Sequence, residues 1–493
     1  MKFIPSILKA AIVVGLSITL FACGSTEGEQ VVVEGSTPAP VEAPPPVNPA
    51  PPEEPAPVPP EEPAPPPPEE PAPPPPEEPA PPPPEEPAPP PSSPEGQVLF
   101  DEDIAKDIRQ SIPTDVNIPL GIQATLDVEY LGAFRVEAGG ESSSNYAVGT
   151  LGYNNDSNSI FMSGHERDYA IAEFEVPIEL SLESTPAAIV LAPVLQSYVS
   201  LSSKRETGRN TNRVNGLLYY KQNLLVSSEF WYDGSADNLD NLQVFSNAND
   251  IATSPFKGML QIDGAARAAG YMSKIPIELQ EKLGSEYLVG WASNYSITSR
   301  YSQGPSLYLF DPQEAIDAVL TVDRTINAVP EMVFPFEDGK HLVEGGNESS
   351  TNISPIWGPL AAAKYGFIIP GTTLFMAIGT QGGIHSGAGY KITQEDSGIL
   401  CGGYCAYQNS DYYNYFWLFD INDIVEAEQP WLARPISYGK WSHPYDTAGT
   451  KQLLGATYDI NNNTLFISIE NAGQIGKYDR PPLILAYKIS AKD

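Results

Sequence analysis

The chain has 493 residues, with 62 Asp and Glu against 27 Lys and Arg, and a formal net charge of −35. A protein this acidic repels phosphate backbones, which argues against nucleic acid as a partner. The length leaves ample chain for a large hydrophobic core.

The first 22 residues have the features of a secretory signal peptide. Lys2 and Lys9 accompany an apolar run over 10–21, which is too short for a membrane-spanning helix of ~20 apolar residues. The run ends in Leu-Phe-Ala-Cys at 20–23, which resembles the lipobox of bacterial lipoproteins. That resemblance implies cleavage before Cys23 and acylation of this residue. The alternative is an ordinary secretory signal followed by an incidental cysteine.

The lipoprotein resemblance also implies a location. Gly24 and Ser25 follow the cysteine, and neither is the aspartate that retains enteric lipoproteins in the inner membrane. The resemblance therefore implies an outer-membrane destination, with the membrane as a partner through the lipid anchor. Buried acyl chains contribute ~0.8 kcal/mol per CH₂ to such anchoring. The sequence leaves open which leaflet carries the anchor.

Residues 23–96 form the lipidated N-terminus and a Pro/Glu-rich linker, in which Glu-Glu-Pro-Ala-Pro-Pro-Pro-Pro repeats with a period of eight. The segment has too little apolar surface to offset the entropy of folding, so we expect it to be disordered. Dense proline favours polyproline II, and at ~3.1 Å per residue the segment 51–91 would reach about 130 Å. We favour a spacer; the alternative is a docking site for a proline-binding partner.

An N-terminal extension, 97–127, precedes a body, 128–493, with strand-like patterns almost throughout. Helical periodicity is confined to short connectors at 312–320 and 421–428. The segment 150–163 aligns without gaps on 455–468, and each copy has a strand, a turn rich in Asn, and a second, apolar strand ending in Ser. Such turn residues tolerate the left-handed backbone that a hairpin requires.

Further copies of this hairpin lie at 215–228, 287–293 and 363–378, and a polar loop and another alternating strand follow each. Five repeats of a multi-strand unit predict an all-β fold, a five-bladed β-propeller, which limits exposed sheet edges by radial repetition. Two adjacent β-sandwiches are the competing architecture, but they would not explain why the first and last hairpins are similar. The segment 129–136 has no hairpin partner, so we expect it to close the ring as the outer strand of the last blade.

Several short motifs also carry a family resemblance. Tyr-Leu-Gly-Ala-Phe-Arg at 130–135, Ser-Gly-His-Glu at 163–166, and Leu-Phe-Asp at 309–311 and 418–420 resemble an uncharacterised family of secreted bacterial propeller-like proteins. The resemblance covers most of 128–489. It implies the propeller architecture and supplies no catalytic residues.

Apart from Cys23, the chain has two cysteines, Cys401 and Cys405, in Cys-Gly-Gly-Tyr-Cys. In an oxidising compartment this pair favours a disulfide that pins an inserted loop. A zinc site would need more ligands, and the spacing differs from the Cys-x-x-Cys of redox enzymes.

In a propeller, the loops at one end of the axial channel form a funnel where ligands bind. The first set of candidates consists of polar or bulky residues where the inner strands begin: Asn145, Tyr146, Asn212, Arg213, Arg267, Trp357, Lys451 and Gln452. Their cations could receive a carboxylate or uronate. Alternatively, they pair with local acids and hold the blades together.

The second set follows the second strand of each repeat: His165, Glu166, Arg167, Glu229, Trp231, Asn294, Tyr295, His385, Glu470 and Asn471. Glu166, Glu229 and Glu470 could supply the acid and base of a glycosidase, and Trp231 a platform for stacking on a sugar. Structural carboxylates at strand ends are the alternative, so the catalytic residues stay unknown.

No cofactor is identified. The glycine-rich loop around His385 lacks the order of a nucleotide-binding loop, and no Gly-x-Ser-x-Gly is present. His165 and His385 could share a metal only if the fold brings them together, so no metal site is predicted. The acidic segment 233–240 could bind calcium, but its spacing departs from the EF-hand loop, and a solvated hairpin tip is the favoured interpretation.

We therefore expect a monomeric, lipid-anchored outer-membrane protein whose propeller binds a ligand, most reasonably a glycan or another cell-envelope component. A polysaccharide-acting glycoside hydrolase and a structural protein-interaction scaffold are the alternatives. A cluster of carboxylates in the funnel would favour the hydrolase, an aromatic funnel would favour binding, and a plugged channel would favour the scaffold.

Overall fold

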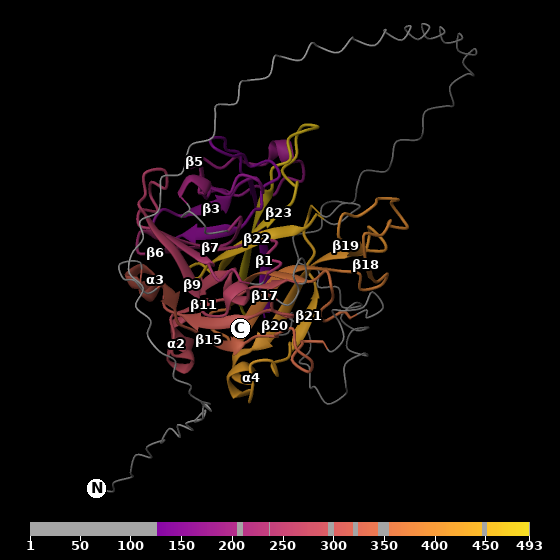
Figure 1. The fold of residues 1–493 in the computed structure, drawn as a ribbon. Helices are drawn as coiled ribbons and strands as arrows, with labels where there is room; N and C mark the ends of the chain where they lie inside the picture. The colour runs from indigo at the N-terminus through magenta and orange to yellow at the C-terminus, as the bar shows by residue number, and fades with distance from the viewer. Residues whose placement is uncertain are drawn as a thin grey trace, which may run out of the picture. The chain divides into compact units, whose positions relative to one another are not determined.

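The strands between Leu126 and Ala491 form five sheets arranged around one axis as a β-propeller (Figure 1). This computed structural model describes residues 126–204, 211–235, 237–293, 300–318, 324–343, 354–445 and 451–492. Cys23, the signal peptide, the Pro/Glu-rich linker and nearly all of the extension 97–127 lie outside the described residues. No helix in these described ranges is long and apolar enough to cross a membrane.

Each blade has four strands that run outward from the axis. Blade 1 contains β2 (Leu151–Asn154), β3 (Ser159–Ser163), β4 (Ala170–Glu175) and β5 (Val194–Ser200). Blade 2 contains β6 (Arg213–Tyr220), β7 (Asn223–Glu229), β8 (Leu242–Phe245) and β9 (Phe256–Ile262), with β14 (Thr325–Ile326) added in parallel. Blade 3 contains β10 (Met272–Lys274), β11 (Tyr287–Val289), β13 (Leu307–Phe310) and β15 (Ala328–Met332).

Blade 4 contains β16 (Ala362–Ile368), β17 (Leu374–Gly382), β20 (Tyr412–Asp420) and β21 (Ser437–Lys440), and β12 (Ala292–Ser293) pairs with β16. Blade 5 contains β22 (Leu453–Asp459), β23 (Thr464–Ile469), β24 (Leu483–Ala491) and β1 (Leu126–Arg135). The short helices are α2 (Ile277–Leu283), α3 (Pro312–Ala318) and α4 (Ile421–Glu426), with 3₁₀ turns η2 (Pro186–Ala188), η3 (Ser202–Lys204) and η4 (Ala265–Ala268). The inner strands β2, β6, β10, β16 and β22 contact one another in a closed ring, which confirms the five-bladed prediction.

The first and last hairpins share the geometry that their sequences share. Asn154 pairs with Ser159 at the tip of β2–β3, and Asp459 pairs with Thr464 at the tip of β22–β23. In both turns the residue before the second strand has a left-handed backbone, with φ of 49° at Asn158 and 56° at Asn463. Asparagine adopts this conformation at low cost, so the similar turn sequences produce the same hairpin in blades 1 and 5.

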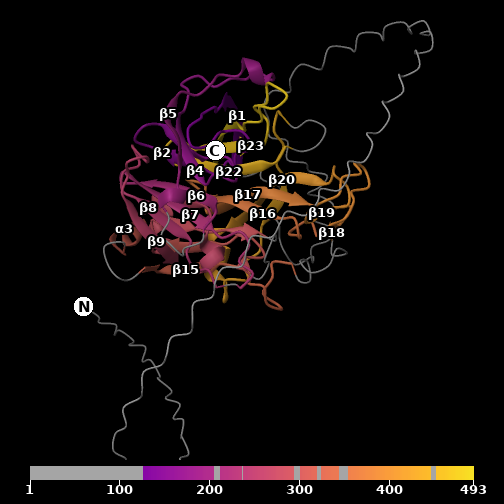
Figure 2. The same cartoon turned by 45° about the horizontal axis from the view of Figure 1, so that its top comes forward.

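The N-terminal strand closes the ring, as the sequence predicts. β1 pairs antiparallel with β24 from Leu126 opposite Ala491 to Arg135 opposite Leu483. Figure 2 shows the indigo strand β1 among the yellow C-terminal strands. Blade 5 is therefore assembled from both ends of the propeller sequence. Blade 3 departs from the repeat, because the copy at 287–293 forms β11 and β12, and its inner strand is β10.

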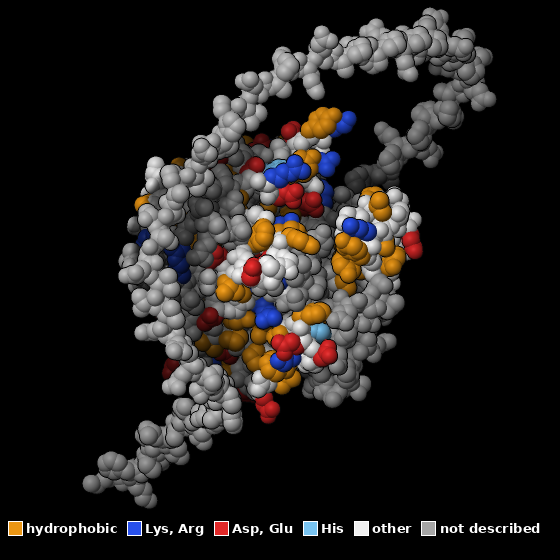
Figure 3. Space-filling model, viewed as in Figure 1, with side chains coloured by type: hydrophobic (Ala, Val, Ile, Leu, Met, Phe, Trp, Pro, Cys, Tyr) orange, Lys and Arg blue, Asp and Glu red, His pale blue; other side chains and the backbone are white. Residues whose placement is uncertain are grey.

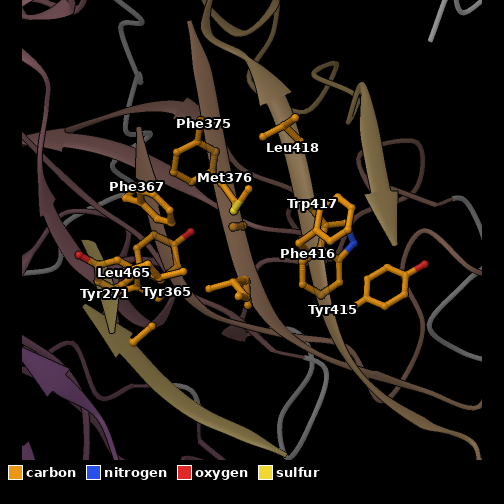
Figure 4. Close-up of a cluster of buried hydrophobic side chains, with 14 of the residues drawn as sticks. Tyr271, Tyr365, Phe367, Phe375, Met376, Tyr415, Phe416, Trp417, Leu418 and Leu465 are labelled. Atoms are coloured by element: carbon orange, nitrogen blue, oxygen red, sulfur yellow. The ribbon is translucent and has the colours of Figure 1, made fainter. Parts of the chain in front are cut away.

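The core consists of apolar side chains packed between neighbouring blades. Figure 4 shows part of it, where Tyr365 and Phe367 from β16 lie near Tyr271 of blade 3. Phe367 also stacks on Tyr458 of blade 5, with ring centroids 4.4 Å apart. Large aromatic side chains bury the most area per residue, so these contacts between sheets hold adjacent blades together.

An insertion, 383–411, separates β17 from β20 in blade 4. It contains the two-stranded sheet β18 (Ala388–Tyr390) and β19 (Tyr404–Ala406). The predicted disulfide is present between Cys401 and Cys405, and Cys405 lies in β19. The pair therefore pins an inserted loop, as its sequence context predicts.

Candidate functional site

A cavity of about 500 Å³ opens at the end of the ring where the inner strands begin. We call it the axial funnel. Its walls come from all five blades, and its polar and aromatic lining residues are Tyr146, Thr150, Glu166, Arg213, Asn215, Glu229, Trp231, Trp291, Ser293, Lys364, Thr380, Tyr404, Tyr412, Gln452, Glu470, Asn471 and Arg480. The volume falls within the range of small-molecule sites, about 300–1,000 Å³.

The same backbone feature places funnel residues on three inner strands. β6, β16 and β22 each contain a register shift against the second strand of their blade, at Asn215, Lys364 and Leu454, and all three residues line the funnel. A β-bulge re-aims the side chain of its extra residue. Gly216 follows the first of these bulges, and a Cβ there would collide with the Gly270 carbonyl of the neighbouring blade.

Three cations of the funnel lie over aromatic rings that also line it. The distances from cation to ring centroid are 3.5 Å for Arg213 over Trp231, 5.0 Å for Lys364 over Trp291, and 5.6 Å for Arg480 over Tyr146. Each contact is worth about 0.5–2 kcal/mol, depending on exposure. In each pair the cation lies over one face of the ring, so a positive charge and an aromatic side chain meet at the same part of the cavity wall.

Glu229 is the buried carboxylate of the funnel, with 4% of its surface exposed. It pairs with Arg213 across β6–β7. Burial raises its pKa, and the Tyr301 hydroxyl and the positive charges of Arg213 and Lys364 only partly oppose that shift. Glu229 Oε2 and the indole Nε1 of Trp291 have no hydrogen-bond partner among the described residues, which leaves both atoms available to a water or a ligand.

The same buried environment shifts the pKa of Lys364 in the opposite direction, downward. Its pKa is lowered to about 8: burial is the largest cause, the carboxylate of Glu229 opposes it, and the nearby Arg213 charge adds to it. Desolvation disfavours the charged form of either group. A cation and a carboxyl group in the funnel are therefore both tuned toward neutrality, which is common at functional sites.

The funnel contains two further carboxyl groups. Glu470 lies at the end of β23 and burial raises its pKa, whereas Glu166 is exposed at the rim. No three His, Cys, Asp or Glu residues in the described ranges lie close enough together to hold a metal ion. The three carboxyl groups of the funnel therefore form no metal-binding cluster among the described residues.

The structure brings eight of the eighteen candidate residues into the funnel: Tyr146, Glu166, Arg213, Glu229, Trp231, Gln452, Glu470 and Asn471. His165 lies beside the rim, where its ring contacts that of Tyr146 at 6.0 Å. Asn145, Asn212 and Arg167 do not line the cavity, and neither do the four residues Arg267, Trp357, Lys451 and His385.

Each of those four has another setting. Trp357 is fully buried, with its ring 5.1 Å from that of Trp417, so it belongs to the core. Arg267 lies in η4, and Lys451 presents its carbonyl to Asn414. The backbone N–H of His385 donates to Asp411 within the insertion. Asn294 and Tyr295 lie outside the described residues.

In the acidic segment 233–240, the first carboxylate, that of Asp233, contacts groups of the protein itself. Asp233 is buried, it pairs with Arg300 at 3.0 Å, and it accepts hydrogen bonds from the backbone N–H groups of Asp237 and Asn238. The Arg300 guanidinium and the two backbone N–H groups therefore account for the buried charge of Asp233.

Sequence reasoning missed Lys364, Trp291 and Arg480. Lys364 is interior to a strand, where alternation predicts only which face a side chain occupies, and the bulge changes that face. Trp291 lies in the link from β11 to β12, and Arg480 in the loop before β24. The signal that could have found Lys364 is its position equivalent to Asn215 in the repeat.

Comparison with known proteins does not assign this chain to a family. No protein-family description matches the chain, and no curated protein matches it significantly. The class of the protein is therefore the one that its fold defines, a five-bladed β-propeller with an open axial funnel.

Proposed function

We propose that this protein is a lipid-anchored cell-envelope protein of the outer membrane that binds an acidic glycan in the axial funnel. The observation that carries this proposal is the set of three cation–aromatic pairs facing one cavity. Aromatic faces stack on the apolar faces of sugar rings, and cations pair with the carboxylates of uronates. A purely apolar ligand would not use the cations, and a purely charged ligand would not use the aromatic rings.

The local sign of charge supports an anionic ligand. The chain as a whole is strongly acidic, whereas this cavity has three cations, Arg213, Lys364 and Arg480, against three carboxyl groups. Burial raises the pKa of two of those carboxyl groups, Glu229 and Glu470, which favours their neutral form. On the face drawn in Figure 3, acidic, basic and apolar side chains are interspersed. A cavity shields such charges from solvent and strengthens their attraction for a carboxylate. The open funnel also argues against a scaffold with a plugged channel.

A glycoside hydrolase is the second candidate, because one observation favours it. Glu229 and Glu470 have raised pKa values, whereas Glu166 is exposed at the same cavity. A retained proton on one carboxyl group and an ionised second group are what glycosidic cleavage needs. The cations near Glu229, Arg213 and Lys364, equally suit a site that binds an acidic glycan without cleaving it.

One experiment separates these functions. The full-length protein in detergent is applied to an array of acidic and neutral oligosaccharides, and both retention and the release of shorter products are measured. Binding predicts retention of uronate-containing glycans without turnover. Product release that Glu229→Gln abolishes would establish the hydrolase instead. Absence of retention of any glycan would contradict both proposals.

A further inference from the structure

The insertion of blade 4 extends the wall of the axial funnel. Tyr404 of β19 and Tyr412 at the start of β20 both line the cavity. Tyr404 lies directly opposite Tyr390 of β18, with ring centroids 5.2 Å apart. A path of aromatic surface therefore leads from the funnel across the insertion to Tyr390.

The insertion is braced from several directions. The buried carboxylate of Asp411 accepts hydrogen bonds from the backbone N–H groups of His385 and Ser386 and from the Ser386 hydroxyl, at 2.7–3.0 Å. The Tyr412 hydroxyl accepts a hydrogen bond from the backbone N–H of Ala406. The Tyr412–Ala406 bond ties β19 to the start of β20, whereas the Asp411 bonds and the Cys401–Cys405 disulfide stiffen the insertion itself. A stiff insertion limits the entropy lost when a ligand binds.

The outer part of the insertion exposes a large apolar area. The exposed fractions are 59% for Tyr390, 43% for Tyr404, 55% for Ile399 and 70% for Leu400. Lys391 lies over the Tyr390 ring at 5.1 Å. In Figure 3, orange side chains surround a basic one where Figure 1 labels β18 and β19. Exposed apolar patches with a polar rim mark interaction sites.

The chemistry of this surface repeats that of the funnel. Lys391 over Tyr390 is the same kind of pair as Lys364 over Trp291, and Tyr404 belongs to both surfaces. We propose that the Tyr404–Tyr390–Lys391 surface is a second subsite, which holds additional sugar units of an acidic oligosaccharide whose first units occupy the funnel. This inference rests on the proposed function and deepens it, because it makes the ligand a polymer.

The test is the dependence of affinity on chain length. Full-length protein in detergent is titrated calorimetrically with oligogalacturonides of increasing length. We expect affinity to rise as the chain outgrows the funnel. Tyr390→Ala should weaken binding of the longest oligomers by about tenfold, as loss of a stacking and cation–aromatic contact implies. The same variant should change the affinity for the shortest ligand, the galacturonate disaccharide, by less than about twofold.

Two controls keep the result interpretable. Tyr390→Phe retains the ring and should keep the length dependence, which a loss of folding would not. Tyr478→Ala removes another exposed tyrosine with a lysine over its ring, one that does not line the funnel, and should have no effect. Length dependence that survives Tyr390→Ala would overturn the subsite, as expected if this surface docks a protein. Absence of binding by any oligomer would instead overturn the proposed function.

Discussion

Lys364 illustrates how one residue acquires a role from the backbone around it. It is the extra residue of a β-bulge in β16, and its ammonium group lies over Trp291 in the funnel. With a pKa of about 8, it is cationic at neutral pH and loses its charge just above that range. Its environment thus makes the positive charge of the funnel dependent on pH.

This property predicts how ligand affinity depends on pH. A uronate is ionised throughout pH 7–9.5, because carboxyl pKa values lie near 4. Since only the protonated form of Lys364 attracts it, affinity should fall as the pH rises through about 8, by up to about tenfold per unit. Lys364→Arg, which stays charged, should give a flat profile, and Lys364→Gln a flat but weaker one. A titration series measures this; a wild-type affinity that does not change up to pH 9.5 would exclude the role of Lys364.

The residue scale also shows what sequence reasoning could predict about the site. Arg213, Glu229 and Trp231 were predictable because they occupy the ends of repeated strands, and the repeat places strand ends at the funnel. Trp357 precedes β16 by five residues, and its position depends on how the intervening turn folds back toward Trp417. Such a path depends on tertiary packing, which a local pattern does not encode.

At the scale of elements, the hairpins and the closing strand were predictable from similarity within the chain. The turns at Asn158 and Asn463 have a chemical signature, and the segment 129–136 lacked a partner of its own. Helices α3 and α4 also begin where the connectors at 312 and 421 predict. Blade 3 was harder to predict, because its inner strand has three residues and carries little periodicity.

Closure by β1 predicts a strong effect of truncation. Removing residues 128–136 would expose the edge of β24, together with the side of the core that Ala133 and Phe134 cover. We expect the truncated chain to lose cooperative thermal unfolding, because blade 5 then lacks its outer strand. A chain that starts at Leu126 keeps β1 and is the matched control. Unchanged melting after removal of 128–136 would contradict the role of β1 in closure.

At the scale of the whole molecule, the proposal joins an anchor, a spacer and a binding domain. A spacer of about 130 Å when extended suits a domain that meets its ligand away from the membrane surface. Lipidation of Cys23 is the part of this proposal that can be tested independently of any ligand.

Metabolic labelling with palmitate tests the anchor. The wild-type chain should incorporate the label, and Cys23→Ser should lose it, because the acylated thiol is gone. Cys401→Ser alters a cysteine of the propeller and should keep the label. Label retained by Cys23→Ser would refute the lipoprotein prediction and leave the funnel proposal intact.

The most direct measurement is a calorimetric titration of the full-length protein with a uronate oligosaccharide retained on the array and with its neutral counterpart. We expect the uronate to bind more tightly, and Arg213→Ala to weaken its binding by at least about tenfold, as loss of a charged contact implies. Arg434→Ala is the control, because that guanidinium bonds backbone carbonyls outside the funnel. Equal affinity for the acidic and neutral sugars, or an Arg213→Ala variant that binds as the wild type does, would contradict recognition of an acidic glycan in the axial funnel.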